Sequence, residues 1–416
     1  MTILMFLRTN VPAIAMAFSD KPFPYGPFVP HWVPKQYVQD YFSCCRTDAY
    51  LALGTTVEDL SKIRTDAILG RERWLVTLRR HDPTRNLDLW WKEDFDAVIL
   101  CNGHYSIPYV PYVPGLETYM HRFPDKVFHS KTYRTASAFK DKRVMVIGNS
   151  ASGHDLVASM VKTARLPVYQ SRRSKAKWDG DEAAPGVKWK PVITRFDAET
   201  GDIAFTDGTS LASDELDFVI YCTGYQASFP FWNGRTNDGP IWNYAANRLE
   251  GSYLHTFFPK HPTLGLVGMP KTLTFRSFEY QAVALARLFA GRAMLPEQAV
   301  MQQWQKEREQ LVRSKHGKFH DVLWAPGGGE AAEYMQALYD MAGLPEFDGK
   351  GRCPPVLDEA TRWALENVKK YVGPVNDPGV VCEDRSSTGK RQKNEDEWFF
   401  VERSAEKKDR SRSCSR

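Results

Sequence analysis

The sequence predicts an α/β protein built around parallel sheets, and three observations support this fold class. Between Arg143 and Ser174, a β-branched run, a glycine-containing turn, a helix-compatible stretch and a second strand follow one another, the order of a β-α-β unit. Two runs, 96–103 and 217–224, share the pattern D-x-V-I-x-C-x-G and resemble strands buried in a parallel sheet. Apolar residues at three- and four-residue spacing then predict covering helices within 277–292, 296–314 and 358–372.

Composition bounds the class of protein. The 416 residues, 43% of them apolar, are enough for two or three domains with their own cores. No run of eighteen apolar residues occurs, which argues against a transmembrane helix. Most of the net charge of +5 lies from Arg385 to Arg416, where there are ten Lys and Arg and six Asp and Glu, so we expect no nucleic-acid partner. The seven cysteines form no CxxC pair, and a cytoplasmic location fits them best.

The segment after the first strand of the β-α-β unit has the chemistry of a phosphate-binding turn. It reads Gly148-Asn149-Ser150-Ala151-Ser152-Gly153. We expect Gly148 to form the tight turn, Gly153 to allow close helix packing, and the helix N-terminus to present N–H groups to a pyrophosphate. Ser150 stands where a middle glycine is usual, so an ordinary strand-to-helix turn remains the alternative.

The second strand of this unit ends in Ser171, Arg172 and Arg173, about twenty residues after the glycines. An acidic residue there favours NAD, whereas arginine suits the 2′-phosphate of NADPH. The alternative is an exposed basic strand end. We predict NADPH.

Two further groupings are interpreted as structural. His316 and His320 lie four residues apart, but the sequence shows no third metal ligand for them, so no metal is predicted. Cys101 and His104 lie in one turn, where a base rarely points at its sequence neighbour, so we expect no nucleophile pair. A hairpin is expected around Asp207-Gly208.

A motif before the glycine turn resembles the flavin-containing monooxygenase family. Phe123 to Arg134 is similar to its fingerprint F-x-G-x-x-x-H-x-x-x-Y, with His129 and Tyr133 in place and Asp125 where the family has glycine. The motif ends in Tyr133-Arg134 rather than Trp-Pro or Trp-Asp, which resembles the heteroatom-oxidising branch rather than the Baeyer-Villiger branch.

Other segments extend the resemblance from Leu7 to about Arg313. The segment 7–24 is similar to one that carries a flavin-contacting asparagine in the family. The segment at 222–231 resembles the family's T-G-Y motif, and 255–281 resembles its flavin-side region. The residues that the resemblance places at the cofactors are Thr9, Asn10, Thr223, Gly224, Tyr225, Glu279 and Gln281.

The resemblance implies two dinucleotide-binding, Rossmann-like domains. The FAD domain is expected to be discontinuous, at 1–140 and 213–376 with C-terminal helices, around an NADPH-binding domain at 141–212. Residues 377–416 lose all periodicity and are expected to be disordered. The family's first glycine-rich unit, which holds the FAD pyrophosphate, has no counterpart before residue 7. The FAD domain is therefore expected to be N-terminally incomplete.

The implied activity is that of a monooxygenase with FAD and NADPH as cofactors. NADPH reduces the flavin, O2 gives a flavin hydroperoxide, and a soft nitrogen or sulfur nucleophile of a small molecule is oxygenated. Asn10 is the residue that the resemblance places beside the reactive flavin edge. The alternative is a non-catalytic NADPH-binding remnant that has lost FAD. The substrate and the oligomeric state stay open.

Overall fold

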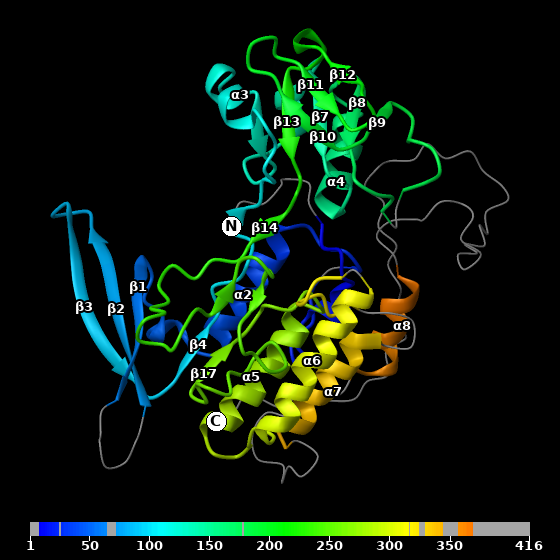
Figure 1. Ribbon diagram of the computed structural model, residues 1–416. Helices are drawn as coiled ribbons and strands as arrows, with labels where there is room; N and C mark the ends of the chain where they lie inside the picture. Colours follow the sequence, from blue (N-terminus) through cyan, green and yellow to red (C-terminus); the bar gives the residue numbers. More distant parts are fainter. Residues whose placement is uncertain are drawn as a thin grey trace.

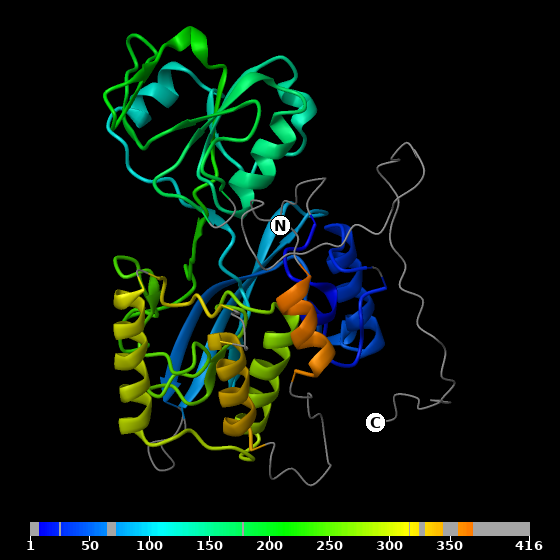
Figure 2. The ribbon, with the colours of Figure 1, turned by 90° about the vertical axis from the view of Figure 1, so that its right-hand side faces the viewer.

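The computed structural model describes residues 8–24, 26–64, 72–176, 179–315, 317–323, 329–343 and 357–368. They form two units that lie one above the other in Figures 1 and 2. The upper unit comprises residues 113–222, and the lower unit comprises the described residues before and after it. Each unit has its own buried core, as the length of the chain predicts.

A parallel five-stranded sheet of order β6-β13-β7-β8-β9 forms the centre of the upper unit. Its strands are β6 (Val127–His129), β13 (Phe218–Tyr221), β7 (Arg143–Ile147), β8 (Arg165–Ser171) and β9 (Val187–Lys190). Side chains alternate between its faces: Val144 and Val146 pack with Leu156 of α4 (Ala151–Met160), whereas Met145 packs with Ile203 in the opposite core. The predicted β-α-β unit is therefore β7-α4-β8.

Shorter elements complete the upper unit. The expected hairpin forms as β11 (Ile203–Phe205) and β12 (Ser210–Leu211), paired with β10 (Ile193–Phe196). The other elements are α3 (Leu116–Arg122), η2 (Ala136–Phe139) and η3 (Ser213–Glu215). The parallel sheet extends beyond the expected boundaries at 141 and 212, because the strand at 218–221 pairs with 144–147 on one side and with the strand at 127–129 on the other.

The lower unit contains a parallel pair and an antiparallel three-stranded sheet. The pair is β4 (Val98–Leu100) with β17 (Leu264–Leu266), and the sheet has the order β1 (Thr55–Arg64), β2 (Glu72–Asp82) and β3 (Leu87–Phe95). The remaining elements are α1 (Ala13–Met16), α2 (Trp32–Cys44), η1 (Asp48–Tyr50), β15 (Trp242–Asn243), β16 (Arg248–Leu249), α5 (Phe275–Phe289), α6 (Gln298–Ser314), α7 (Gly329–Met341) and α8 (Glu359–Asn367).

The late helices agree with the periodicity of the sequence. Helices α5, α6 and α8 lie in the expected stretches, and α7 is an addition. Leu285, Leu338 and Leu365 of α5, α7 and α8 share one buried cluster, which fixes these helices to the lower unit. Among the described residues, no helix is long and apolar enough to span a membrane. The predicted disorder at 377–416 concerns residues outside the described ranges.

Candidate functional site: the junction of two parallel sheets

The carboxyl ends of both parallel sheets point toward the junction of the two units. Strand β13 ends at Tyr221 and leads within four residues into β14 (Tyr225–Gln226), and β4 leads within seven residues into β5 (Ile107–Pro108). Strands β5 and β14 pair with each other and form the crossing between the units (Figure 1). Since β7 is parallel to β13, and β17 to β4, four strand ends open toward this junction. Ligands of open α/β sheets bind at such carboxyl edges.

The two sequence repeats end in equivalent turns at this crossing. Gly103 after β4 and Gly224 after β13 have φ of 66° and 88°, a backbone conformation that glycine adopts without steric cost. The Thr223 hydroxyl donates to the Tyr109 carbonyl, and the Tyr109 amide donates to the Gly224 carbonyl at 2.9 Å. The T-G-Y motif therefore fastens one crossing strand to the other. Tyr225 adds an edge-on ring contact with Tyr105, at 5.6 Å between centroids.

The glycine turn between β7 and α4 lies at the same junction and leaves no room for side chains. Gly148 has φ of 108°, and a Cβ there would stand 2.8 Å from the Cys222 carbonyl oxygen. A Cβ on Gly153 would stand 2.1 Å from the Gly148 carbonyl oxygen. Ser150 begins the helix, is exposed, and makes no side-chain capping hydrogen bond. The exposed N-terminus of α4 thus follows directly on a tight glycine turn, an arrangement that is typical of phosphate-binding turns.

Asp179, which the sequence motifs did not single out, organises the side chains beside this turn. Its Oδ2 accepts hydrogen bonds from Asn149 Nδ2 at 2.7 Å, the Ala176 amide at 2.9 Å and Arg172 Nη1 at 2.9 Å. Burial raises the pKa of Asp179, but these three donors outweigh it and hold the pKa below its usual range. Arg172 also lies over the Trp189 ring, 3.3 Å from its centroid. The guanidinium of Arg172 is therefore engaged in contacts within the protein.

Ser171 and Arg173 do not share the contacts that Arg172 makes with Asp179 and Trp189. The Ser171 hydroxyl is buried and donates to the Pro191 carbonyl at 2.7 Å, which is a structural role. Arg173 is exposed. The pKa of Lys318 is lowered chiefly by Lys271, then by burial and by Arg173, with Asp321 acting in the opposite direction. Lys318 of the lower unit therefore lies within electrostatic reach of Arg173.

The residues expected on the flavin side lie in the lower unit, and most are engaged in the protein. Thr9 Oγ1 accepts from the Val29 amide at 3.1 Å, and Asn10 is exposed. Buried Glu279 accepts from the amide and hydroxyl of Ser19, at 2.8 and 2.6 Å. These bonds connect α5 to the segment that carries Asn10.

Gln281 is a second anchor on α5. It is fully buried, accepts from the Gly268 amide at 3.1 Å and donates to Thr256 Oγ1 at 2.7 Å. Gly268 follows β17, so Gln281 fixes the turn at the carboxyl end of that strand. In this structure Glu279 and Gln281 thus position backbone around the junction.

The structure explains why aspartate is tolerated at position 125 and why Cys101 and His104 do not form a nucleophile pair. Asp125, where the family has glycine, has φ of 67°, so the backbone there is left-handed and aspartate is among the residues that tolerate it. Burial raises the pKa of the Cys101 thiol, while burial and Lys271 lower the pKa of His104 to about 4. Both groups are neutral near pH 7, which does not match an activated thiolate.

Fold and junction together define the class of protein: an α/β protein with two opposed parallel sheets, typical of two-dinucleotide oxidoreductases. The chain belongs to the flavin-binding monooxygenase-like family, whose model matches residues 2–178 and 183–340. The neighbouring solved structures include S-allyl-L-cysteine S-oxygenase from Allium sativum, with a TM-score of 0.69 and 24% identity over 88% of this chain and 78% of that one. This likeness supports the fold.

Two curated relatives indicate the extent of the match. The chain is 32% identical to the trimethylamine monooxygenase of Roseovarius sp. (strain 217), over 84% of this chain and 73% of the relative. It is 28% identical to the flavin-containing monooxygenase iboF of Amanita muscaria (strain Koide BX008), over 76% of this chain. The match spans 66% of the length of iboF.

Proposed function

We propose that this chain acts as an NADPH- and FAD-dependent monooxygenase that uses O2 to oxygenate a soft nitrogen or sulfur nucleophile of a small molecule. The observation that carries the proposal is the junction itself, where the carboxyl ends of the two parallel sheets face each other. Two dinucleotides bound at opposed carboxyl edges meet at their reactive ends. Family membership, and the activities by which a trimethylamine monooxygenase and an S-oxygenase among the similar proteins are named, support the nucleophile class.

The residues of the upper unit fit NADPH. In this glycine cradle, Gly148 and Gly153 let the turn pack closely against α4, where a Cβ on either would collide with a carbonyl oxygen of the chain, and the N–H groups at the start of α4 would bind the pyrophosphate. Arg173 would hold the 2′-phosphate, because it is exposed, whereas Arg172 is committed to Asp179. The cytoplasmic location expected from the cysteines is consistent with NADPH as the reductant and is part of this proposal.

The residues of the lower unit fit FAD less completely than those of the upper unit fit NADPH. Bound FAD supplies the redox chemistry, transferring electrons from NADPH to O2. The amide of Asn10 would hydrogen-bond near the reacting centre, and the crossing that contains Tyr105 and Tyr225 would restrict water. Gly103 and Gly268, at the lower carboxyl edge, form no such cradle, because neither leads directly into a helix: β5 follows the first, and α5 begins only at Phe275 after the second.

That difference favours a second candidate, an NADPH-binding protein without flavin. The upper unit holds a glycine turn that leads directly into a helix, with Ser150 in the middle position, and the carboxyl edge of the lower unit has no such turn among its described residues.

One experiment separates the two candidates. The chain is incubated with FAD, freed of excess, and its visible spectrum recorded before and after anaerobic NADPH, with NADH as the control. A retained flavin band that NADPH bleaches faster than NADH supports the monooxygenase. NADP+ binding without any retained flavin supports the second candidate and contradicts the first.

A further inference from the structure

The three-stranded sheet of the lower unit extends away from the core and ends in an uncovered strand. Near its base, Leu60, Trp74 and Val76 are buried against the core. Beyond them the sheet stands apart from the rest of the described chain, with β3 at its outer edge (Figure 1). All of β3 except Trp91 is exposed, Trp90 at 58%. An exposed edge strand of this length is a template for pairing with another strand.

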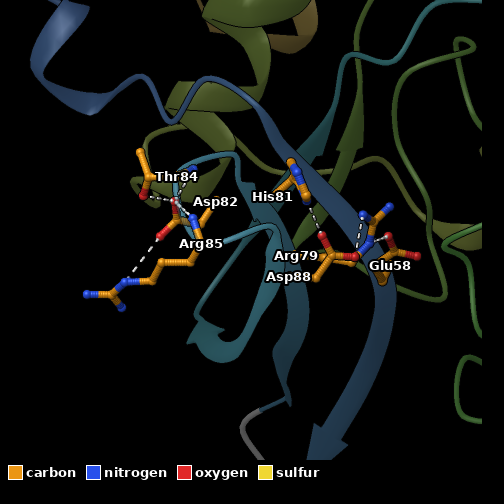
Figure 3. Close-up of polar contacts among 7 residues, drawn as sticks. All are labelled: Glu58, Arg79, His81, Asp82, Thr84, Arg85 and Asp88. Atoms are coloured by element: carbon orange, nitrogen blue, oxygen red, sulfur yellow. Dashed lines mark hydrogen bonds and ion pairs between the residues drawn. The ribbon is translucent and has the colours of Figure 1, made fainter.

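One face of this sheet is polar and internally paired (Figure 3). Arg79 on β2 contacts Glu58 at 2.6 Å and Asp88 at 3.2 Å, and His81 contacts Asp88 at 2.9 Å. The Arg79 guanidinium also lies over the Trp90 ring, at 5.7 Å from its centroid. These contacts hold the side chains of Asp88 and Trp90 of β3 against β2.

The turn between β2 and β3 is fastened as well. Asp82 Oδ1 accepts hydrogen bonds from the Thr84 amide at 2.9 Å and the Thr84 hydroxyl at 2.6 Å, as Figure 3 shows. Such an Asx-type turn fixes the register of the hairpin. The edge is thereby held in an extended form, which lowers the entropy lost when another strand pairs with it.

The other face carries apolar side chains that continue outward from the core. Val57, Leu87 and Leu89 are 39%, 40% and 38% exposed, and Leu78 and Trp91 lie between them in the register of the sheet. Because residues 55–95 contain eight acidic and eight basic residues, this segment has no net charge to repel a copy of itself.

We propose that β3 pairs antiparallel with β3 of a second copy of this chain, which makes a continuous sheet across a two-fold axis. Opposed residues in an antiparallel pair share a face, so only registers that match even with even positions, and odd with odd, keep the apolar face continuous. With Trp90 opposite its own copy, Asp88 meets Lys92 of the second copy on the polar face. Leu89 meets Trp91 of the second copy on the apolar face, and each pair occurs twice.

Neighbouring registers are less favourable. With Trp91 opposite its copy, Asp88 would face Asp94 of the second copy, and with Lys92 opposite its copy two ammonium groups would meet. With Leu89 opposite its copy, the overlap would shrink to the residues 87–91 of β3. The register centred on Trp90 is thus the longest one without opposed like charges.

Charge-reversal variants test the pairing of the two β3 strands. Their association is measured by sedimentation velocity across a concentration series. The wild-type chain is expected to dimerise. Lys92→Glu and Asp88→Lys each place like charges opposite one another twice and are expected to weaken dimerisation at least about tenfold. The double variant exchanges the charges and is expected to restore dimerisation, although it still lacks the contacts of Asp88 with Arg79 and His81. That rescue separates pairing from a folding defect.

The matched control is Lys188→Glu, an equal charge change on the exposed edge of β9 in the upper unit, which is expected to leave association unchanged. A chain that is monomeric at every concentration, or dimers that are indifferent to Lys92→Glu, would overturn the proposal.

Disulfide trapping tests the register. Opposed Cα atoms in an antiparallel pair lie about 4.5 to 5.5 Å apart, within the range of a disulfide. Trp90→Cys is therefore expected to form a disulfide with its own copy, identified by mass spectrometry of the linked peptides. Trp91→Cys, offset by two residues from its copy, is expected not to. The reverse pattern would contradict this register.

Discussion

The two units differ in how their expected cofactor residues are built, although both contain a parallel sheet that ends in a positive-φ glycine. In the upper unit, the glycine turn and the end of β8 lie on adjacent strands, and Gly148 donates its amide to the Ser171 carbonyl at 2.8 Å. In the lower unit, Glu279 and Gln281 bond to residues as distant as Ser19. The residues of the upper site lie close together in the sequence, so a sequence motif can reveal them. The residues of the lower site come from distant segments, and only the tertiary structure brings them together.

The largest expected effect breaks the local motif. Gly153→Ala places a Cβ 2.1 Å from the Gly148 carbonyl oxygen, so helix α4 must shift away from the turn. We expect a loss of about 2 to 3 kcal/mol in the free energy of unfolding and at least tenfold weaker NADP+ binding. Urea unfolding and calorimetry measure the two. Gly180→Ala is the control, because its Cβ has 3.5 Å to the nearest atom; equal effects of both variants would contradict the cradle.

The second largest effect is expected for Gln281, whose hydrogen bonds join distant segments of the lower unit. Gln281→Leu leaves the Gly268 amide and the Thr256 hydroxyl without this buried partner. We expect a loss of about 2 kcal/mol in stability, with NADP+ affinity unchanged because the upper unit keeps its own core. The exposed Gln336→Leu on α7 serves as control. If NADP+ affinity fell as well, the two units would not be independent.

Arg173 tests the cofactor preference of the upper unit. Arg173→Ala is expected to weaken NADP+ binding about tenfold, since a charge-assisted contact to the 2′-phosphate is worth roughly 1.5 kcal/mol, and to leave NAD+ binding unchanged. Fluorescence titration with both dinucleotides measures this. Arg165→Ala, at the amino end of the same strand, should alter neither. An equal loss for NAD+ would argue against a 2′-phosphate contact.

The smallest effect is a pH dependence in the upper unit. Hydrogen bonds from Arg143 lower the pKa of Asp217 to about 2, against burial, which raises it. Because the folded pKa is depressed, the carboxylate stabilises the fold above its unfolded pKa of about 4, and this contribution disappears as pH falls through 2. Asp217→Asn is expected to cost about 1 kcal/mol at pH 7, allowing for solvent screening, and little at pH 2. A constant difference across that range would contradict the ion pair.

The sequence predicted the features that depend on near neighbours. The β7-α4-β8 unit, the matched glycine turns and the late helices follow from periodicity and turn chemistry. The β1-β2-β3 sheet was not predicted, because charged side chains interrupt its alternation, as in β3. Asp179 was missed for a related reason: its partners Asn149 and Arg172 meet it only after the chain returns from β8. An acidic residue shortly after two arginines was the one available signal.

The most direct test of the central claim, that the glycine turn at the junction holds NADP(H), is hydrogen–deuterium exchange of the chain with and without NADP+. We expect slower exchange of the backbone amides from 149 to 154 and from 171 to 174, and no change at Lys188 on β9 or on the β3 edge. NAD+ is expected to protect the first segment and not the second. Unchanged exchange at 149–154 under saturating NADP+ would contradict the account.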